Sequence, residues 1–239
     1  LAHDAGSKVV VHIHSGKFHT WLGSENSRNT RNMRTDLASL SAPAVVLSEH
    51  WARTFHEYFK NLRVIGNPIN PSTQFIAGQR DENHVLLLGR NDSVKGHEFA
   101  KLAIESLRKK RPNLRLSMTG VSDSSEPWAS GLGWISEEEK AVLLQTSSVL
   151  LVPSLFEGQP LVVFEALASG LPVLASDSIH SVPDSVVHAR YHDLEDWVEK
   201  LDAILEVSID SAALLESVKE HHISHVQKHW QTLYEELLL

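Results

Sequence analysis

Short runs of β-branched and aliphatic residues alternate with longer amphipathic stretches along this 239-residue sequence. The short runs have the composition of buried strands, and the longer stretches have the apolar spacing of helices. This alternation is typical of βα units, in which helices cover a parallel sheet. We therefore expect an α/β protein with strands at 8–14, 43–48, 62–66, 84–88, 114–119, 131–135, 148–152 and 172–175. Helices are expected at 29–40, 49–60, 94–110, from 137 onward, and at 160–168, 193–206 and 211–237.

The predicted strands fall into two groups. Residues 67–83 are rich in Asn, Pro, Ser, Gln and Asp and form the best candidate linker. The part after this linker supplies enough strands for a complete doubly wound sheet. Residues 1–66 supply only three strands, about half of such a sheet. We therefore expect a second lobe at 84–215, an incomplete first lobe at 1–66 and a closing helical segment at 216–239.

Composition excludes several functional classes. Disulfide frameworks, thiolate zinc sites and cysteine nucleophiles are excluded because the chain has no cysteine. The formal net charge of −8 argues against general nucleic-acid binding, although residues 1–111 hold 16 basic and 10 acidic side chains. No apolar run approaches the roughly 20 residues of a membrane-spanning helix. The sequence thus predicts a cytoplasmic protein without a nucleic-acid partner.

A first chemistry-bearing segment joins a predicted buried strand to a helix. The strand ends at Gly89, and Arg90 and Lys95 follow before the helix. Ligands of open α/β sheets bind at the carboxyl ends of strands, and helix N-termini attract anions. The two cations would suit a diphosphate. The alternative is an ordinary exposed Arg and Lys beside a helix, since the glycine patterns of P-loops and dinucleotide folds are absent.

A second segment spans residues 153–172. Its strand leads to Glu157 and Gly158, and Pro160 suits the first turn of a helix that carries Glu165. The backbone N–H groups from Gly158 to Leu161 would face an anion. The two carboxylates could accept hydrogen bonds from sugar or ribose hydroxyls. Their spacing alone is common, and the surrounding Gly and Pro residues make the pair informative.

These segments together resemble the retaining glycosyltransferases of family 4. Their signature is a Glu, seven residues and a second Glu, which Glu157 and Glu165 match. The family has the GT-B fold, with two Rossmann-like doubly wound lobes. The resemblance covers most of the chain from about Lys8 onward, including the segments 10–16, 45–51, 64–70, 89–96 and 230–237.

The resemblance implies an activity. Such an enzyme moves a sugar from a nucleotide-diphosphate donor, UDP- or GDP-type, to a hydroxyl of a carbohydrate or lipid-linked acceptor with retention. It does so in glycan or polysaccharide biosynthesis, with no metal and no further cofactor. By resemblance, residues 1–66 form the acceptor-side lobe and 84–215 the nucleotide-sugar lobe. The helix within 216–239 would cross back to the first lobe.

The resemblance also implies roles for individual residues. Arg90 and Lys95 would bind the diphosphate and stabilise charge on the leaving group. Glu157 would hold the donor sugar and Glu165 the ribose, and His14 would reach the sugar on the acceptor side. The implied catalytic set is Arg90, Lys95, Glu157 and His14. The implied donor-binding set is Gly89, Arg90, Lys95, Gly120, Trp134, Ile135, Glu157, Gly158, Gln159, Pro160, Leu161 and Glu165, with Gly120 and the 134–135 backbone at the base.

The sequence also departs from the family pattern. Gly66 stands where the family usually has Pro, Asn70 stands where it often has Asp, and the family's N-terminal Gly-rich loop is absent. Two alternatives therefore stay open. One is a non-catalytic nucleotide-sugar-binding module or fragment, and the other is a sugar-nucleotide epimerase on the same fold.

Two further clusters have competing interpretations. Arg28, Arg31 and Arg34 form a basic helical stripe, which is either a solvated face or a contact for anionic lipid or a phosphorylated acceptor. Lipid contact would place the protein peripherally on the cytoplasmic face of the membrane. Three histidines at 222, 225 and 229 share a helix face, which favours a solvent-facing or interdomain helix over a metal site.

Overall fold

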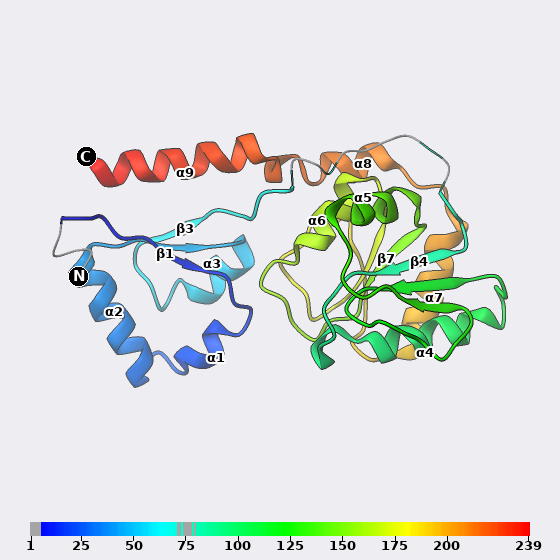
Figure 1. Cartoon of the computed structure of the whole chain (residues 1–239). Coiled ribbons are helices and arrows are strands. Elements are labelled where there is room, and N and C mark those ends of the chain that lie inside the picture. The colour runs from blue at the N-terminus through cyan, green and yellow to red at the C-terminus, as the bar shows by residue number, and fades with distance from the viewer. Residues whose placement is uncertain (1–5, 71–72, 74–77, 79) are drawn as a thin grey trace. The chain divides into compact units, whose positions relative to one another are not determined.

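The structure is a computed structural model that describes residues 6–70, 73, 78 and 80–239. The chain divides into two compact units (Figure 1). Unit 1 comprises Leu1–Pro68, Glu157–Pro160 and Glu220–Leu239, and unit 2 comprises Ile69–Phe156 and Leu161–Lys219. Each is an α/β unit built on a parallel sheet, as the alternating sequence pattern predicts.

Unit 1 contains a three-stranded parallel sheet in the order β1-β2-β3. The strands are β1 (Val11–Ile13), β2 (Ala44–Val46) and β3 (Leu62–Val64). Consecutive parallel strands require crossovers, which α2 (Arg28–Leu40) and α3 (Glu49–Phe55) provide. Ser48 caps α3 by accepting a hydrogen bond from the Trp51 amide.

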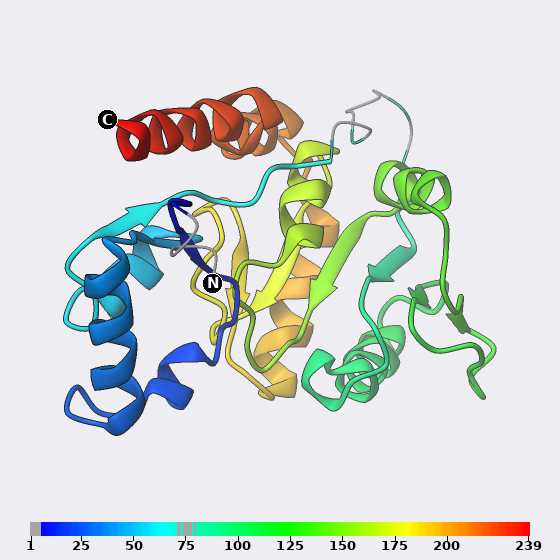
Figure 2. The same cartoon turned by 60° about the vertical axis from the view of Figure 1, so that its left-hand side comes forward.

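Both faces of this sheet are covered by helices. Successive residues of a strand point to opposite faces, so Ala44 and Val46 share a core with α2, α3 and the short α1 (Phe18–Leu22). Val45 and Ile65 face the other way and pack against α9 (Ile223–Leu238). Figure 2 shows α9 along one side of the sheet and α2 along the other. The last helix of the chain is therefore part of the core of unit 1.

Unit 2 contains a six-stranded parallel sheet in the order β6-β5-β4-β7-β8-β9. The strand order reverses between β4 and β7, as in a doubly wound nucleotide-binding fold. The buried positions of β4 and β7 are apolar on both faces, which is typical of a central parallel strand. The strands are β4 (His84–Leu87), β5 (Arg115–Met118), β6 (Ala129–Gly131), β7 (Val149–Val152), β8 (Val173–Ser176) and β9 (Val187–Ala189).

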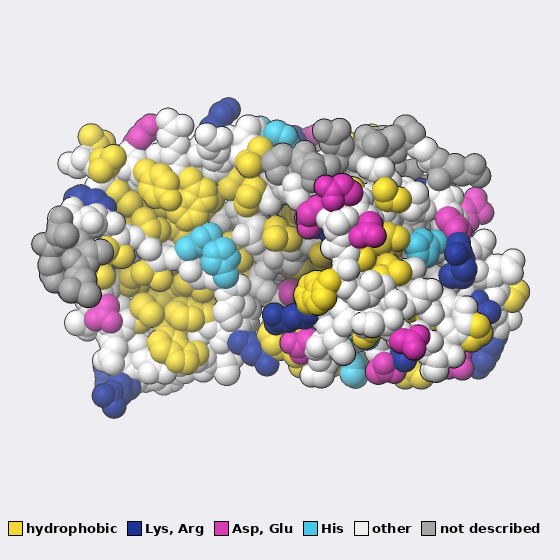
Figure 3. All heavy atoms as spheres, viewed as in Figure 1, with side chains coloured by type: hydrophobic (Ala, Val, Ile, Leu, Met, Phe, Trp, Pro, Cys, Tyr) yellow, Lys and Arg dark blue, Asp and Glu magenta, His cyan; other side chains and the backbone are white. Residues whose placement is uncertain are grey.

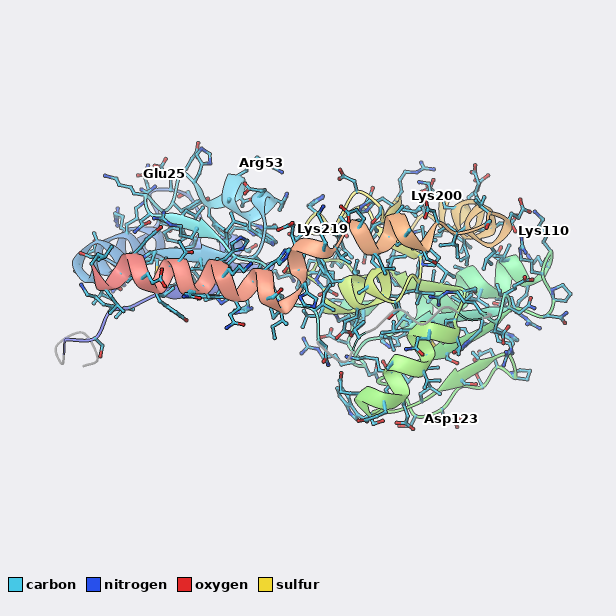
Figure 4. All side chains as sticks on the ribbon, turned by 90° about the horizontal axis from the view of Figure 1, so that it is seen from above. Glu25, Arg53, Lys110, Asp123, Lys200 and Lys219 are labelled. Carbon is cyan, nitrogen blue, oxygen red and sulfur yellow. The ribbon has the colours of Figure 1, made fainter. Side chains whose placement is uncertain are left out.

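Helices cover both faces of this second sheet. On one face, α4 (His97–Arg108) and α7 (Leu194–Glu206) share a core with alternate residues of the central strands. On the other lie α5 (Glu137–Thr146), α6 (Leu161–Ala168) and α8 (Ser211–Glu216). Lys110 and Arg111 both pair with Asp202 of α7, and Figure 4 shows Lys110 beside this helix. Ser136 caps α5 in a capping box with Glu139, in the acidic first turn of the helix.

Some predicted boundaries are wrong. The strand expected at 131–135 ends at Gly131, because the backbone turns at Gly133 with a φ of +63°. The helix expected from residue 94 begins at His97, because Gly96 adopts a left-handed conformation with a φ of +74°. The short edge strand β9 and the single-turn α1 were not predicted.

Other differences concern the helices of unit 1 and the linker. The helix expected at 49–60 ends at Phe55, where the chain turns so that Phe59 also enters the core. The helix expected at 211–237 is divided into α8 and α9 by a 3₁₀ turn at Lys219–His221, and His222 caps α9. Residues 71, 72, 74–77 and 79 of the predicted linker lie outside the described residues.

Candidate functional site

The strand order of unit 2 determines where a ligand is expected to bind at the carboxyl edge of its sheet. Where strand order reverses, the loops after the two central strands lead to helices on opposite faces, and ligands bind there. In unit 2 this point lies between β4 and β7. The loop after β4 carries Gly89, Arg90 and Lys95, and the chain after β7 leads to α6. The sequence-predicted diphosphate residues thus lie at the switch point.

Thr119 fixes the loop after β4. The Gly89 amide donates to Thr119 Oγ1 at 2.8 Å, and this hydroxyl donates to the Gly89 carbonyl at 3.1 Å. The ring of His97, the first residue of α4, bonds through Nε2 to the Thr119 carbonyl at 2.9 Å. The ends of β4 and β5 and the start of α4 are therefore tied together.

Gly120 allows the neighbouring loops to approach closely. Its φ is +80°, and a Cβ there would lie 2.4 Å from the Gly89 carbonyl oxygen. Its amide donates to the Gly133 carbonyl at 2.9 Å, which links the loops after β5 and β6. Only glycine fits this position without a backbone shift. Gly120, which was predicted to line the base pocket, therefore contributes by letting these loops pack closely, because it has no side chain.

The two cations of this edge have different surroundings. The guanidinium of Arg90 is 68% exposed and lies 3.5 Å from Asp92. The stem of Lys95 runs beside Gly89, about 3.5 Å from where a Cβ on that glycine would lie. Lys95 ends the 3₁₀ turn Ser93–Lys95 (η2), directly before α4. Lys95 directly precedes the 12-residue helix α4, whose start stabilises an anion, and Arg90 lies in the loop that leads to it.

The loop between β6 and α5 carries the other predicted base-pocket residues. The Trp134 side chain is 85% exposed, whereas Ile135 packs against the core on the α5 and α6 side. This loop joins the loop after β5 through the backbone bond between Gly120 and Gly133. An exposed indole with an anchored neighbour offers a flat apolar surface in the loop after β6.

Glu165 is a buried carboxylate in the second turn of α6. Glu165 as a whole is 4% exposed, and its Oε1 accepts a hydrogen bond from Lys140 Nζ at 2.9 Å. Oε2 is closed to solvent and makes no hydrogen bond among the described residues. A buried acceptor without a donor costs free energy, and such atoms are typical of sites that await a ligand.

The predicted loop Glu157–Pro160 belongs to unit 1, although the chain on either side of it belongs to unit 2. A Cβ on Gly158 would lie 2.1 Å from the His14 carbonyl oxygen, and one on Gly16 would lie 2.5 Å from the Glu157 carbonyl oxygen. The loop backbone therefore lies directly against the residues that follow β1. The structure brings His14 and Glu157, both predicted to be catalytic, into the same part of unit 1.

Two side chains hold this loop. Trp51 Nε1 donates to the Gly158 carbonyl at 2.5 Å. The buried Gln159 donates through Nε2 to the Leu47 carbonyl at 2.8 Å and accepts from the Asn67 amide at 2.7 Å. The side-chain amide of Gln159 thus bonds to backbone groups after β2 and β3. A contact of Gln159 with a nucleotide-sugar donor would therefore come from its backbone.

His14 forms a histidine pair with His12 of β1. Their rings are bonded through His14 Nε2 and His12 Nδ1 at 3.0 Å, and His12 also contacts Trp230 edge-on. Burial, together with the charge of His14, lowers the pKa of His12 to about 4. His12 Nε2 is buried without a hydrogen bond among the described residues. Figure 3 shows histidines within an apolar surface on this face of unit 1.

The remaining predicted clusters have structural explanations. Arg34 donates to the carbonyls of Glu57 and Tyr58 and pairs with Glu25, so only part of the basic stripe faces outward. No three His, Asp or Glu side chains in the described ranges are arranged to hold a metal ion. No helix formed by these residues is long and apolar enough to cross a membrane. Membrane contact stays a prediction.

Comparison with known families identifies the family to which unit 2 belongs. The family described as "Glycosyl transferases group 1" matches residues 72–221, which span nearly all of unit 2. The chain belongs to this family. An uncharacterized glycosyltransferase from Haemophilus influenzae is 26% identical over 179 residues, which are 67% of this chain and 51% of that protein.

Solved glycosyltransferase structures share the fold of this family member. The pneumococcal O-GlcNAc transferase GtfA, in complex with UDP and GlcNAc, superposes with a TM-score of 0.74 at 16% identity over 96% of this chain and 52% of its own. Anabaena HepE, in complex with UDP and glucose, gives 0.72 at 15% identity over 99% and 73%. The fold is therefore the GT-B type that the resemblance predicts. The chain spans about half the length of GtfA and of the Haemophilus protein.

The predicted site residues of this family member fall into two groups. His14 and residues 157–160 belong to unit 1, and the others, including Leu161 at the start of α6, belong to unit 2. Sequence reasoning missed Thr119, Trp51 and Lys140 as supporting residues. Thr119 could have been found, because it directly precedes the predicted site residue Gly120. Trp51 and Lys140 could not, because they contact residues that are far away in the sequence.

Proposed function

We propose that this glycosyltransferase moves a sugar from a nucleotide-diphosphate donor, of the UDP or GDP type, to a hydroxyl acceptor with retention of configuration. One observation carries the proposal. The carboxyl edge of unit 2 carries two cations between β4 and α4, and α6 carries a buried carboxylate whose Oε2 makes no hydrogen bond among the described residues. A nucleoside diphosphate offers the matching groups, namely two phosphates and a ribose diol.

The proposed chemistry is mainly electrostatic. When the bond between the sugar and the diphosphate breaks, negative charge accumulates on the departing diphosphate. Arg90 and Lys95, with the N-terminus of α4, would stabilise that charge. Charge stabilisation at a preorganised site is often the largest contribution to catalysis. The two side chains would thereby supply the positive charge without a metal ion.

The residues of unit 1 are proposed to act on the sugar and the acceptor. Glu157 would hold hydroxyls of the donor sugar, and His14 would contact the sugar on the acceptor side. The solved relatives GtfA and HepE hold UDP together with a sugar, which supports a nucleotide sugar as the donor. We propose a glycan or polysaccharide as the product, made on the cytoplasmic side.

Binding of nucleotides tests the proposal directly. Titration calorimetry of the full chain with UDP, GDP and ADP is expected to show one preferred nucleotide. Arg90→Ala should weaken that affinity about 10- to 100-fold, because a charge-assisted contact to phosphate is lost. Arg190→Ala is the matched control, since its guanidinium is 67% exposed and also pairs with an Asp. Equal affinities of both variants would contradict the assignment.

Turnover separates the enzyme from its alternatives. Release of the nucleotide diphosphate in the presence of an acceptor supports the transferase. Binding without any release supports a non-catalytic nucleotide-sugar-binding module. Conversion of the donor sugar without an acceptor supports an epimerase.

A further inference from the structure

Lys140 of α5 holds one side of the Glu165 carboxylate. The ammonium lies 2.9 Å from Glu165 Oε1, and the two side chains are 18% and 6% exposed. The other oxygen, Oε2, is closed to solvent without a hydrogen bond in the described part of the chain. The lysine therefore fixes the carboxylate in one orientation and leaves one acceptor unused.

Lys140 is itself held in place. Glu137 lies 2.8 Å from the ammonium and also accepts a hydrogen bond from Asn70 at 2.9 Å. Burial lowers the pKa of Lys140, but its hydrogen bonds to Glu137 and Glu165 outweigh burial, so the pKa is raised overall. Lys140 thus stays a cation at neutral pH. This network belongs to α5, α6 and the chain before β4, all within unit 2.

The network lies between the two predicted parts of the nucleotide site. α5 begins directly after the loop of Trp134 and Ile135, which is proposed to face the base. α6 begins beside the switch point, where Arg90 and Lys95 are proposed to bind the diphosphate. The ribose of a nucleotide connects its base to its phosphates. A carboxylate oxygen on α6 would then face the ribose rather than either end of the nucleotide.

We propose that Lys140 is a positioning residue for ribose recognition. It binds Glu165 Oε1 and fixes the orientation of the carboxylate, so that Oε2 accepts a hydrogen bond from a ribose hydroxyl. This inference rests on the proposed function, because it requires a nucleotide at the switch point. Lys140 touches no reacting atom and acts only through Glu165.

Ribose discrimination is the readout that distinguishes positioning from a purely structural role. The full chain is titrated with UDP, GDP and their 2′,3′-dideoxy forms. The wild-type chain is expected to prefer the ribose form of the bound nucleotide by about tenfold, because the dideoxy form leaves Oε2 without a donor. Lys140→Met should lose this preference while its affinity for the dideoxy form stays unchanged. Lys140→Arg should restore most of it.

Lys101→Met is the matched control. Lys101 of α4 is 21% exposed and pairs with Glu98 at 2.8 Å, so it resembles Lys140 in burial and pairing. Its variant should keep the ribose preference. If Lys140→Met does not fold, Lys140→Gln retains a neutral donor of shorter reach, and the same loss is expected.

Two results would overturn the inference. Full ribose preference in folded Lys140→Met or Lys140→Gln would overturn it alone and would leave the proposed function standing. Absence of binding by the wild-type chain to UDP, GDP and ADP would overturn the proposed function and this inference with it.

Discussion

At the scale of single residues, the site depends on side chains whose partners are distant in the sequence. Lys140 and Glu165 are 25 residues apart, and Trp51 and the Gly158 carbonyl are 107 apart. The Gly, Pro and Glu residues of the predicted motifs are recognisable because their chemistry is local. A supporting lysine or tryptophan carries no such local mark, since only the fold decides what it touches.

His12 provides a residue-scale prediction about pH. Its pKa is about 4 in the folded protein and about 6.5 when unperturbed, so the unfolded chain binds more protons between these values. Stability should therefore fall as pH falls from about 6.5 to 4. His12→Asn should reduce that slope by less than about 1.4 kcal/mol per pH unit, because the ring is only partly buried. Urea unfolding at pH 7 and 5 measures it.

His56→Asn is the control for this prediction. His56 is exposed on unit 1, with its side chain 68% accessible. Its variant should keep the wild-type slope. An unchanged slope in His12→Asn would show that His12 takes up its proton equally in the folded and unfolded chain.

At the scale of elements, the order of strands and helices could be predicted from the sequence, whereas the boundaries of several elements could not. The parallel sheets follow from alternating apolar runs, and the caps at Ser48 and Ser136 follow from local chemistry. The helix start at His97 and the end of β6 depend on glycines with positive φ. β9 has only three residues at a sheet edge, so its pattern is too short to distinguish it from a loop.

Gly120 gives a prediction at this scale, because it joins the loops after β4, β5 and β6. Gly120→Ala should destabilise the protein by more than about 2 kcal/mol, since an unfavourable φ is combined with backbone overlap. Gly133→Ala is the control. Gly133 also has a positive φ, but the nearest atom to its Cβ position is 3.8 Å away. Its variant should cost about 1 kcal/mol in urea unfolding. Equal losses would show that the loops move apart easily.

At the scale of the whole molecule, the division into units follows the sequence only in part. The change of rhythm near residues 67–83 marks one boundary. The apolar face of the last helix indicates burial but not which sheet it covers. Inclusion of residues 157–160 in unit 1 depends on tertiary contacts of Trp51 and Gln159, which no local pattern encodes.

Leu233 tests the place of α9 in unit 1. It is buried with Val45 and Ile65, so Leu233→Ala should cost about 2–5 kcal/mol and lower the hydrogen-exchange protection of β2 and β3. Leu238→Ala makes the same chemical change at a side chain that is 78% exposed and should have little effect. Protection of β4 and β7 is expected to be unaffected. Loss of protection there instead would contradict the assignment of α9.

The composition of unit 1 also bears on how the protein is made. A ribosome releases the chain from its N-terminus, and domains generally fold as their residues emerge. β2 and β3 precede unit 2 in the sequence, whereas α9, which covers one face of their sheet, follows it. The core of unit 1 is therefore completed only after all of unit 2 has been synthesised, and its strands keep one apolar face uncovered during that time.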